Sequence, residues 1–187
     1  MRKILITLLL TLTLVSCTDK KEEIPTYPYT PAYKVVDMSS YDGVSSTGHN
    51  FRLTLPSEIF KVIEEKSSCV FYLGRSDCGC CQRVCKYLNE VAKELDVYVY
   101  YIDAYNEEEP CTDEEMMERL YETLYPILDY QDGEKCLLTP HVFAIINGEF
   151  KGTLVCTGKL RFDSVPSEKQ IEALKDEYRK ILNPFVK

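Results

Sequence analysis

An apolar run and the helix after it constrain the fold of this 187-residue chain more than any other feature. Residues 69–73 (CVFYL) are continuously apolar, which is typical of a strand buried on both faces of a sheet. Apolar residues then recur at helical spacing from about Cys78 to Leu95, and Val97–Ile102 indicates a second strand. This strand–helix–strand order predicts a parallel pair, and therefore an α/β fold.

The rest of the chain predicts three more helices and a hairpin. A helix follows Pro56 through about Lys66, and another, in an acidic insertion, spans Thr112–Tyr125. Four apolar residues of the second helix are expected to point inward: Met116, Met117, Leu120 and Leu124. Strands over 137–146 and 150–156 flank Asn147-Gly148, a strong hairpin signal, and a last helix starts after Pro166 with Ser167 as its cap.

The N-terminus predicts export. Two cationic residues precede a short apolar run from Ile4 to Val15, which is typical of a cleaved signal peptide and too short to span a membrane. The small residue Ser16 before Cys17 resembles a bacterial lipoprotein signal, in which cleavage after residue 16 leaves Cys17 to carry the lipids. We therefore expect a signal at 1–16, a tether at 17–50 that is rich in polar residues and proline, and one domain at 51–187.

The net charge and the cysteine content indicate which partners and which compartment to expect. The net charge is −8, and removal of the signal would lower it to −10 because Arg2 and Lys3 leave with it, so nucleic acid is not an expected partner. We expect the lipid on Cys17, rather than surface charge, to hold the chain at a membrane on the outer side. Eight of the nine cysteines remain besides Cys17, an even number that suits an oxidising compartment.

Cys78 and Cys81 form a CxxC pair where the first strand leads into the helix. A thiol at a helix N-terminus is stabilised as a thiolate by the unpaired backbone N–H groups, whereas a cysteine one turn further in is more buried. This predicts that Cys78 attacks a disulfide and Cys81 resolves the mixed disulfide. An adjacent carboxylate, Asp77, is expected to raise the pKa of Cys78. The motif calls for no cofactor.

The element order, the CxxC pair, Tyr100–Asp103 and Thr139-Pro140 together resemble the thioredoxin superfamily, over roughly residues 55–183. Within this superfamily, the chain resembles the small exported thioredoxin-like proteins of the bacteriocin transport accessory type. The resemblance implies a central mixed sheet flanked by helices, with a cis Pro140 and with Thr139 offering its backbone to substrate beside Cys78. It also implies exported cysteine-containing polypeptides as substrates and a redox partner that resets the site. The buried acid of many thioredoxins is replaced by Tyr72.

The other cysteines carry separate expectations. On a helical wheel Cys85 falls within about 20° of Cys78, so it is a candidate third thiol that could accept a disulfide from Cys81; an inert buried cysteine is the alternative. A disulfide between Cys111 and Cys136 would close the acidic insertion and contribute about 3.5 kcal/mol. We expect it as a structural bond.

Two other functions fit the same residues. Cys78, Cys80, Cys81 and Cys85, with His141, supply soft ligands for copper(I) or zinc, as in copper chaperones of thioredoxin fold. A non-enzymatic module that uses the fold to hold a partner is the third class, because a fold does not determine a function.

Overall fold

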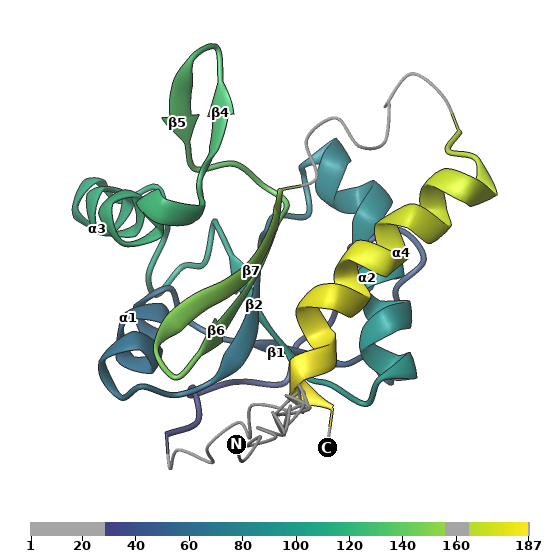
Figure 1. Cartoon of the computed structure of the whole chain (residues 1–187), viewed down its shortest axis with the longest axis horizontal. Coiled ribbons are helices and arrows are strands. Elements are labelled where there is room, and N and C mark those ends of the chain that lie inside the picture. The colour runs from purple at the N-terminus through teal and green to yellow at the C-terminus, as the bar shows by residue number, and fades with distance from the viewer. Residues whose placement is uncertain (1–28, 156–164, 187) are drawn as a thin grey trace, which may run out of the picture.

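The computed structural model describes residues 29–155 and 165–186, and it places a five-stranded sheet at the centre (Figure 1). The strand order in the sheet is β1-β3-β2-β6-β7. The strands are β1 (Phe51–Leu53), β2 (Cys69–Gly74), β3 (Val99–Asp103), β6 (His141–Ile146) and β7 (Glu149–Val155).

The sheet is mixed. Strand β3 pairs in parallel with both β1 and β2, whereas β6 is antiparallel to β2 and β7 is antiparallel to β6. The predicted parallel strand–helix–strand unit is therefore present. The predicted hairpin is present too, since Asn147 and Gly148 both have positive φ, 55° and 79°. A side chain at Gly148 would also come within 2.6 Å of the Ile63 carbonyl oxygen, so this turn requires glycine.

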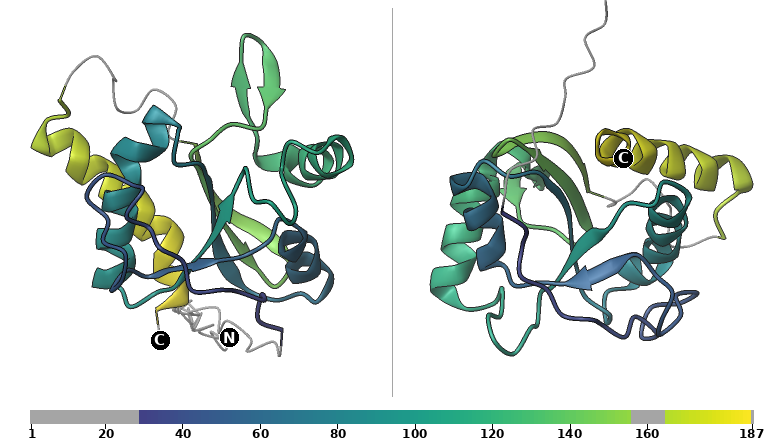
Figure 2. Two further views of the ribbon diagram at one scale, coloured as in Figure 1. Left: turned by 180° about the vertical axis from the view of Figure 1, so that it is seen from behind. Right: turned by 90° about the horizontal axis from the view of Figure 1, so that it is seen from below.

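Helices cover both faces of the sheet (Figures 1 and 2). One face carries α2 (Gly79–Glu94) and α4 (Glu168–Leu182), and the other carries α1 (Ser57–Glu64) and α3 (Glu114–Leu124). Helix α4 begins as expected, because the Ser167 and Gln170 side chains cap each other's backbone N–H groups.

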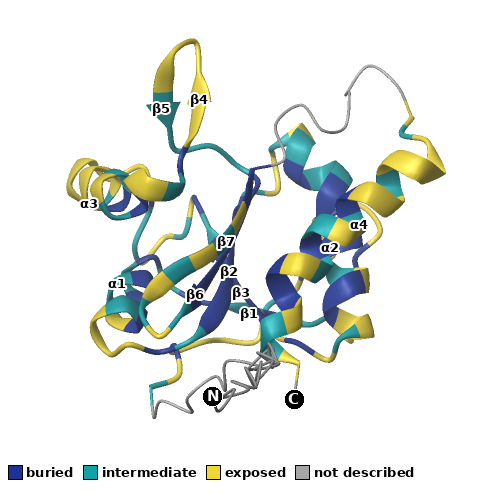
Figure 3. Ribbon diagram, viewed as in Figure 1, coloured by how far each residue is buried: buried dark blue, intermediate teal, exposed yellow. Residues whose placement is uncertain are grey.

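Alternation along the strands divides the core in two (Figure 3). On β2, Val70 and Tyr72 face α2 and α4, while Phe71 and Leu73 face α1 and α3. All four are almost completely buried, because a central strand has a helix layer on each side. This three-layer α/β arrangement is the thioredoxin-like fold that the sequence predicts.

The acidic insertion differs from its prediction in two respects. Within α3, Leu120 and Leu124 are buried, but Met117 is 45% exposed, so its expected inward position was wrong. After a short 3₁₀ turn at Tyr125–Ile127, a hairpin of β4 (Asp129–Gln131) and β5 (Glu134–Cys136) projects away from the central sheet (Figure 1). The sequence did not predict this hairpin, because its strands are short and exposed and lack an apolar alternation.

Residues 29–50 belong to the folded domain, which corrects the domain boundary expected at residue 50. Met38 and Tyr41 are fully buried in the core on the α2 side, and the Tyr41 and Tyr101 hydroxyls lie 2.9 Å apart. Lys34 forms an antiparallel bridge with Leu53. The polar, proline-containing composition concealed a few widely spaced apolar residues that are buried in the core, although most of the segment is exposed.

Residues 1–28 and 156–164 lie outside the described part of the chain, and with them the expected signal peptide, Cys17 and Cys156. Among residues 29–155 and 165–186, no helix is both long enough and apolar enough to cross a membrane. Two short segments complete the described elements, the 3₁₀ turns at Tyr125–Ile127 and Asn183–Phe185.

Candidate active site

Cys78 is the N-cap residue of α2. Its backbone is extended (φ −84°, ψ 114°), and the helix starts at the following glycine. The thiol is partly exposed, and the backbone N–H groups of Cys80 and Cys81 lie close to it. Burial acts to raise the pKa of Cys78, but these N–H groups, the Cys81 thiol and Thr139 outweigh burial, so the pKa is lowered. The thiolate is therefore favoured at this position.

Cys81 lies one turn further along α2 and has no exposed surface. Burial raises the pKa of its thiol to about 12, since a buried sulfur loses the solvation of its charged form. The two cysteines of the motif are thus unequal, with an accessible thiol of lowered pKa and a buried thiol of raised pKa. This asymmetry is the one expected of an attacking and a resolving cysteine.

The loop before β6 reaches the same sulfur. The Thr139–Pro140 peptide bond is cis, and the Cys78 thiol donates to the Thr139 carbonyl oxygen at 3.7 Å. The fold therefore brings together two motifs that are 61 residues apart in the sequence. Thr139 is half-buried, whereas Pro140 is buried beneath it.

Asp77 does not act on Cys78 as the sequence predicted. Its carboxylate is bound by Arg75, whose Nε donates to Oδ1 at 2.8 Å and whose Nη2 donates to Oδ2 at 3.3 Å. The pKa of Cys78 is lowered rather than raised, because the N–H groups of Cys80 and Cys81, the Cys81 thiol and Thr139 outweigh burial. The expectation was wrong because it considered the carboxylate without these hydrogen bonds.

Tyr72 lies in the core on the α2 side, in the same cluster as Cys81 and Cys85. Its side chain is completely buried among aromatic rings, and the ring centroids of Tyr41 and Tyr101 lie 6.3 and 5.6 Å from its own. The ring extends over Gly74, where a side-chain Cβ would lie 2.6 Å from the Tyr72 hydroxyl oxygen. Sequence reasoning singled out Tyr72 but missed the role of Gly74. A glycine two residues further along the same strand was the available signal.

Cys85 and Cys80 take different surroundings on α2. Cys85 is fully buried, and burial raises the pKa of its thiol, while the Tyr72 hydroxyl acts in the opposite direction. Cys80 is half-exposed, and the pKa of its thiol is raised by burial and by nearby Cys78. The helix therefore directs Cys85 into the core, whereas Cys80 stays partly exposed.

The expected Cys111–Cys136 disulfide is not formed. All seven cysteines of the described residues are free thiols. Cys111 is buried in the core on the α1 side, near Leu120 and Leu124. Cys136 lies instead on the projecting β5 strand, opposite Asp129, and its thiol donates to the Glu134 carbonyl at 3.6 Å. The sequence placed neither cysteine: Cys111 is held in the core, whereas Cys136 ends a hairpin strand that was not predicted.

His141 is buried at the start of β6 and packs edge-on against Phe143. Its Nε2 lies 2.7 Å from the Thr153 hydroxyl, and its Nδ1 has no hydrogen-bond partner. Burial lowers the pKa of His141 to about 4, so the ring is neutral at physiological pH. It is therefore a packing residue rather than a charged neighbour of Cys78.

The copper or zinc alternative requires a cluster of soft ligands. Within residues 29–155 and 165–186, no three His, Cys, Asp or Glu side chains are grouped so that they could hold a metal ion. The cysteines that suggested a metal site are spread around α2, with Cys81 and Cys85 inside and Cys80 outside.

Comparisons with known proteins returned only structures. No protein-family model matches the sequence, and no curated protein matches it. Thioredoxin O2 from Arabidopsis thaliana in its oxidized state is 17% identical, with 76% of this chain and 100% of that chain covered and a TM-score of 0.43. Thioredoxin from Trypanosoma brucei brucei is 12% identical over 75% and 99%, with a TM-score of 0.43. Thioredoxin F from spinach chloroplast is 14% identical over 72% and 98%, with a TM-score of 0.40. It is the order of its own strands and helices that makes this chain thioredoxin-like in fold.

Proposed function

We propose that this protein is a thiol–disulfide oxidoreductase that acts outside the cytoplasm on exported polypeptides. One observation carries the proposal: the accessible Cys78 thiol, with a lowered pKa, lies beside the Thr139 carbonyl, and the buried Cys81 thiol lies one turn behind it. A thiol of this kind attacks a disulfide, and a neighbouring thiol completes the exchange.

Exchange proceeds through two displacements. The Cys78 thiolate attacks one sulfur of a substrate disulfide, forms a mixed disulfide and releases the other substrate sulfur as a thiolate, which takes up a proton. Cys81 then loses its proton and attacks the Cys78 sulfur, so that the Cys78–Cys81 bond forms and the second substrate thiol leaves. The substrate disulfide is reduced to two thiols and the enzyme dithiol is oxidised. Run backwards, the same steps oxidise a substrate dithiol.

The Thr139 loop supplies the place for the substrate chain. Its carbonyl borders the reacting sulfur, and an extended polypeptide that hydrogen-bonds this loop would carry its own sulfur to Cys78. The proposed substrates are therefore polypeptides with an accessible cysteine, and a separate redox partner must restore the starting state of the site.

The proposed location depends on Cys17. Lipids on this residue would anchor the chain at a membrane, and the residues before position 29 would connect the anchor to the domain. Incorporation of labelled palmitate into the full chain tests the anchor: it should be lost in Cys17→Ala and kept in Cys136→Ser. Equal labelling of both variants would exclude Cys17 as the lipid site.

Redox titration in glutathione buffers tests the exchange itself. The Cys78–Cys81 pair should show one two-electron transition. A potential of about −270 mV would indicate a reductant and one of about −120 mV an oxidant. Reduction of a model disulfide should require Cys78, so Cys78→Ser should abolish it, Cys81→Ser should accumulate mixed disulfide, and Cys136→Ser should behave as wild type.

The same variants separate the proposal from a partner-binding module. If Cys78→Ser kept the cellular role of the protein, exchange would not be its purpose. If Cys78 and Cys81 formed no disulfide at any buffer potential, the proposed activity would be wrong.

A further inference from the structure

The Tyr72 hydroxyl is buried without a partner. It has no exposed surface, and it forms no hydrogen bond with any of the residues that the structure describes. An unpaired buried hydroxyl is costly, so its retention calls for an explanation. The chain also provides Gly74, where any side chain would collide with this hydroxyl, so the local backbone accommodates the group.

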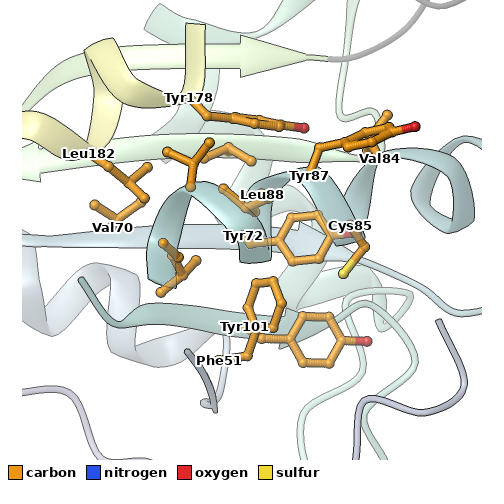
Figure 4. Packing of buried hydrophobic residues seen from close by; sticks show 14 of the residues in the cluster. Phe51, Val70, Tyr72, Val84, Cys85, Tyr87, Leu88, Tyr101, Tyr178 and Leu182 are labelled. Carbon is orange, nitrogen blue, oxygen red and sulfur yellow. The ribbon is translucent and has the colours of Figure 1, made fainter. Parts of the chain in front are cut away.

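The Tyr72 hydroxyl lies next to the Cys85 side chain. Figure 4 shows the Tyr72 ring and the Cys85 side chain next to each other in the core between β2 and α2. Of the titratable groups that act on Tyr72, Cys85 acts most strongly, ahead of Tyr41 and Cys81. A hydroxyl that lacks a partner while Cys85 is a neutral thiol is available to donate a hydrogen bond once that sulfur becomes a thiolate.

Cys81 and Cys85 are placed for a bond to each other. Both have no exposed surface, and both point from α2 into the same core. Residues four apart on an ideal helix have Cα atoms about 6.2 Å apart, within the range over which disulfides form. The corresponding distance for Cys78 and Cys81, three apart, would be about 5.1 Å in an ideal helix.

We infer that Cys85 is a second resolving thiol, which takes over the disulfide from Cys81 with the Tyr72 hydroxyl stabilising the attacking sulfur. The inference rests on the proposed function in one respect, since it starts from the Cys78–Cys81 disulfide. Cys85 thereby becomes a catalytic residue and Tyr72 its hydrogen-bond donor.

The step balances without any other reactant. Cys85 loses its proton and attacks the Cys81 sulfur, the Cys81–Cys85 bond forms, and the Cys78–Cys81 bond breaks. Cys78 leaves with the electron pair and takes up the proton that Cys85 lost. One disulfide is exchanged for another, so nothing is oxidised or reduced overall. Cys78 is a good leaving group here, because the backbone N–H groups at the start of α2 stabilise its thiolate.

As a consequence, the disulfide would be stored in the buried Cys81–Cys85 pair while the Cys78 thiol is free. After one exchange with substrate, the Cys78 sulfur would be available again, and the buried pair would hold the disulfide until a redox partner removed it. A two-cysteine site would instead leave Cys78 blocked between turnovers.

The tryptic map of α2 makes the test direct. Cleavage after Arg75, Arg83 and Lys86 places Cys78, Cys80 and Cys81 on peptide 76–83 and Cys85 on peptide 84–86, so the Cys80→Ser variant is used to assign the bonds. A Cys78–Cys81 disulfide is internal to the first peptide, whereas a Cys81–Cys85 disulfide links the two. The full chain is oxidised with diamide, its free thiols are blocked with N-ethylmaleimide at timed intervals, and the non-reduced digest is analysed by mass spectrometry.

We expect the internal disulfide to appear first and the linked peptides to follow, with blocked Cys78 in the linked form. Cys81→Ser and Cys85→Ala should remove the linked form, and Cys80→Ser should retain it. Tyr72→Phe keeps the ring and removes only the hydroxyl, so conversion should slow by about tenfold, as expected for one lost hydrogen bond to a charged sulfur. The internal disulfide of Tyr72→Phe should form at the wild-type rate, which a general structural defect would not allow.

The outcomes are distinct. An internal disulfide with no linked peptides above the Cys81→Ser background would overturn the inference and leave the proposed function intact. Neither disulfide would overturn the proposed function. Linked peptides at an unchanged rate in Tyr72→Phe would remove the tyrosine from the inference.

Discussion

Arg75 and Asp77, two residues apart in the loop before α2, form a two-point ion pair with N–O distances of 2.8 and 3.3 Å. The pair lies directly before Cys78. The Cys78 sulfur is one of the groups that raise the pKa of Arg75, so the guanidinium is also close enough to interact with the thiolate. The negative charge of Asp77, which would disfavour a thiolate at Cys78, is therefore paired with the positive charge of Arg75. Both side chains are substantially exposed, so the effect is a matter of reactivity rather than of stability.

Arg75→Gln should raise the pKa of Cys78, because Asp77 is then left uncompensated next to the sulfur. The pH dependence of Cys78 alkylation measures this, and its midpoint should move to higher pH. The double variant Arg75→Gln/Asp77→Asn, which removes both charges, should move the midpoint back toward the wild-type value. An unchanged midpoint in the single variant would mean that the pair has no influence on the thiol.

Gly74→Ala should destabilise the domain by about 1–3 kcal/mol, because its new Cβ would meet the Tyr72 ring and hydroxyl at 2.6 Å on a buried central strand. Urea unfolding followed by circular dichroism gives the free energy. Replacing Tyr72 by valine in the same chain should recover part of the loss relative to Tyr72→Val alone, because the collision is gone. Gly79→Ala is the control, because its added Cβ has no atom within 4 Å. Gly133→Ala is unsuitable, because Gly133 has a positive φ that alanine adopts only with strain.

His141 should make the domain less stable in acid. Burial lowers its pKa from 6.5 to about 4, so the folded state binds fewer protons than the unfolded state between these values. Stability contributed by the neutral ring is complete above pH 6.5 and is lost as pH falls toward 4, by roughly 3 kcal/mol in total. The difference in unfolding free energy between pH 7 and pH 4 should shrink by about this amount in His141→Leu. A difference equal to that of the wild type would show that His141 is not the group responsible.

Tyr41 should contribute to stability as a core residue, although it lies in a segment whose composition indicated a tether. Its ring is buried and its hydroxyl lies 2.9 Å from that of Tyr101, so Tyr41→Ala should cost about 3–5 kcal/mol. Val35, in the same segment, is 91% exposed, and Val35→Ala should change stability by less than about 0.5 kcal/mol. Equal unfolding midpoints for the two variants would restore the tether interpretation of this segment.

The local patterns in the sequence were sufficient for most of the fold. The run at residues 69–73, the helix after Cys78 and the Asn147-Gly148 turn each specify a structure through nearby residues, because periodicity and positive φ are local properties. The same is true of Ser167 as a helix cap. The position of Cys78 at a helix N-terminus was predictable for this reason, and so was the unequal burial of Cys78 and Cys81.

The features that the sequence misjudged all depend on contacts between distant residues. The burial of Met38 and Tyr41 requires the surface of α2 and β3, and the position of Cys136 depends on the pairing of β5 with β4. The effective charge of Asp77 depends on how the Arg75 side chain turns back toward it.

The sequence by itself determined which residues can do chemistry and where along the secondary structure they lie, because those properties follow from residue type and local spacing. Only the tertiary structure decided that Thr139 borders the Cys78 sulfur and that the Tyr72 hydroxyl is enclosed beside Cys85. These relationships form when β2, β6 and α2 pack together, and no local pattern specifies the direction of a side chain across a packed core.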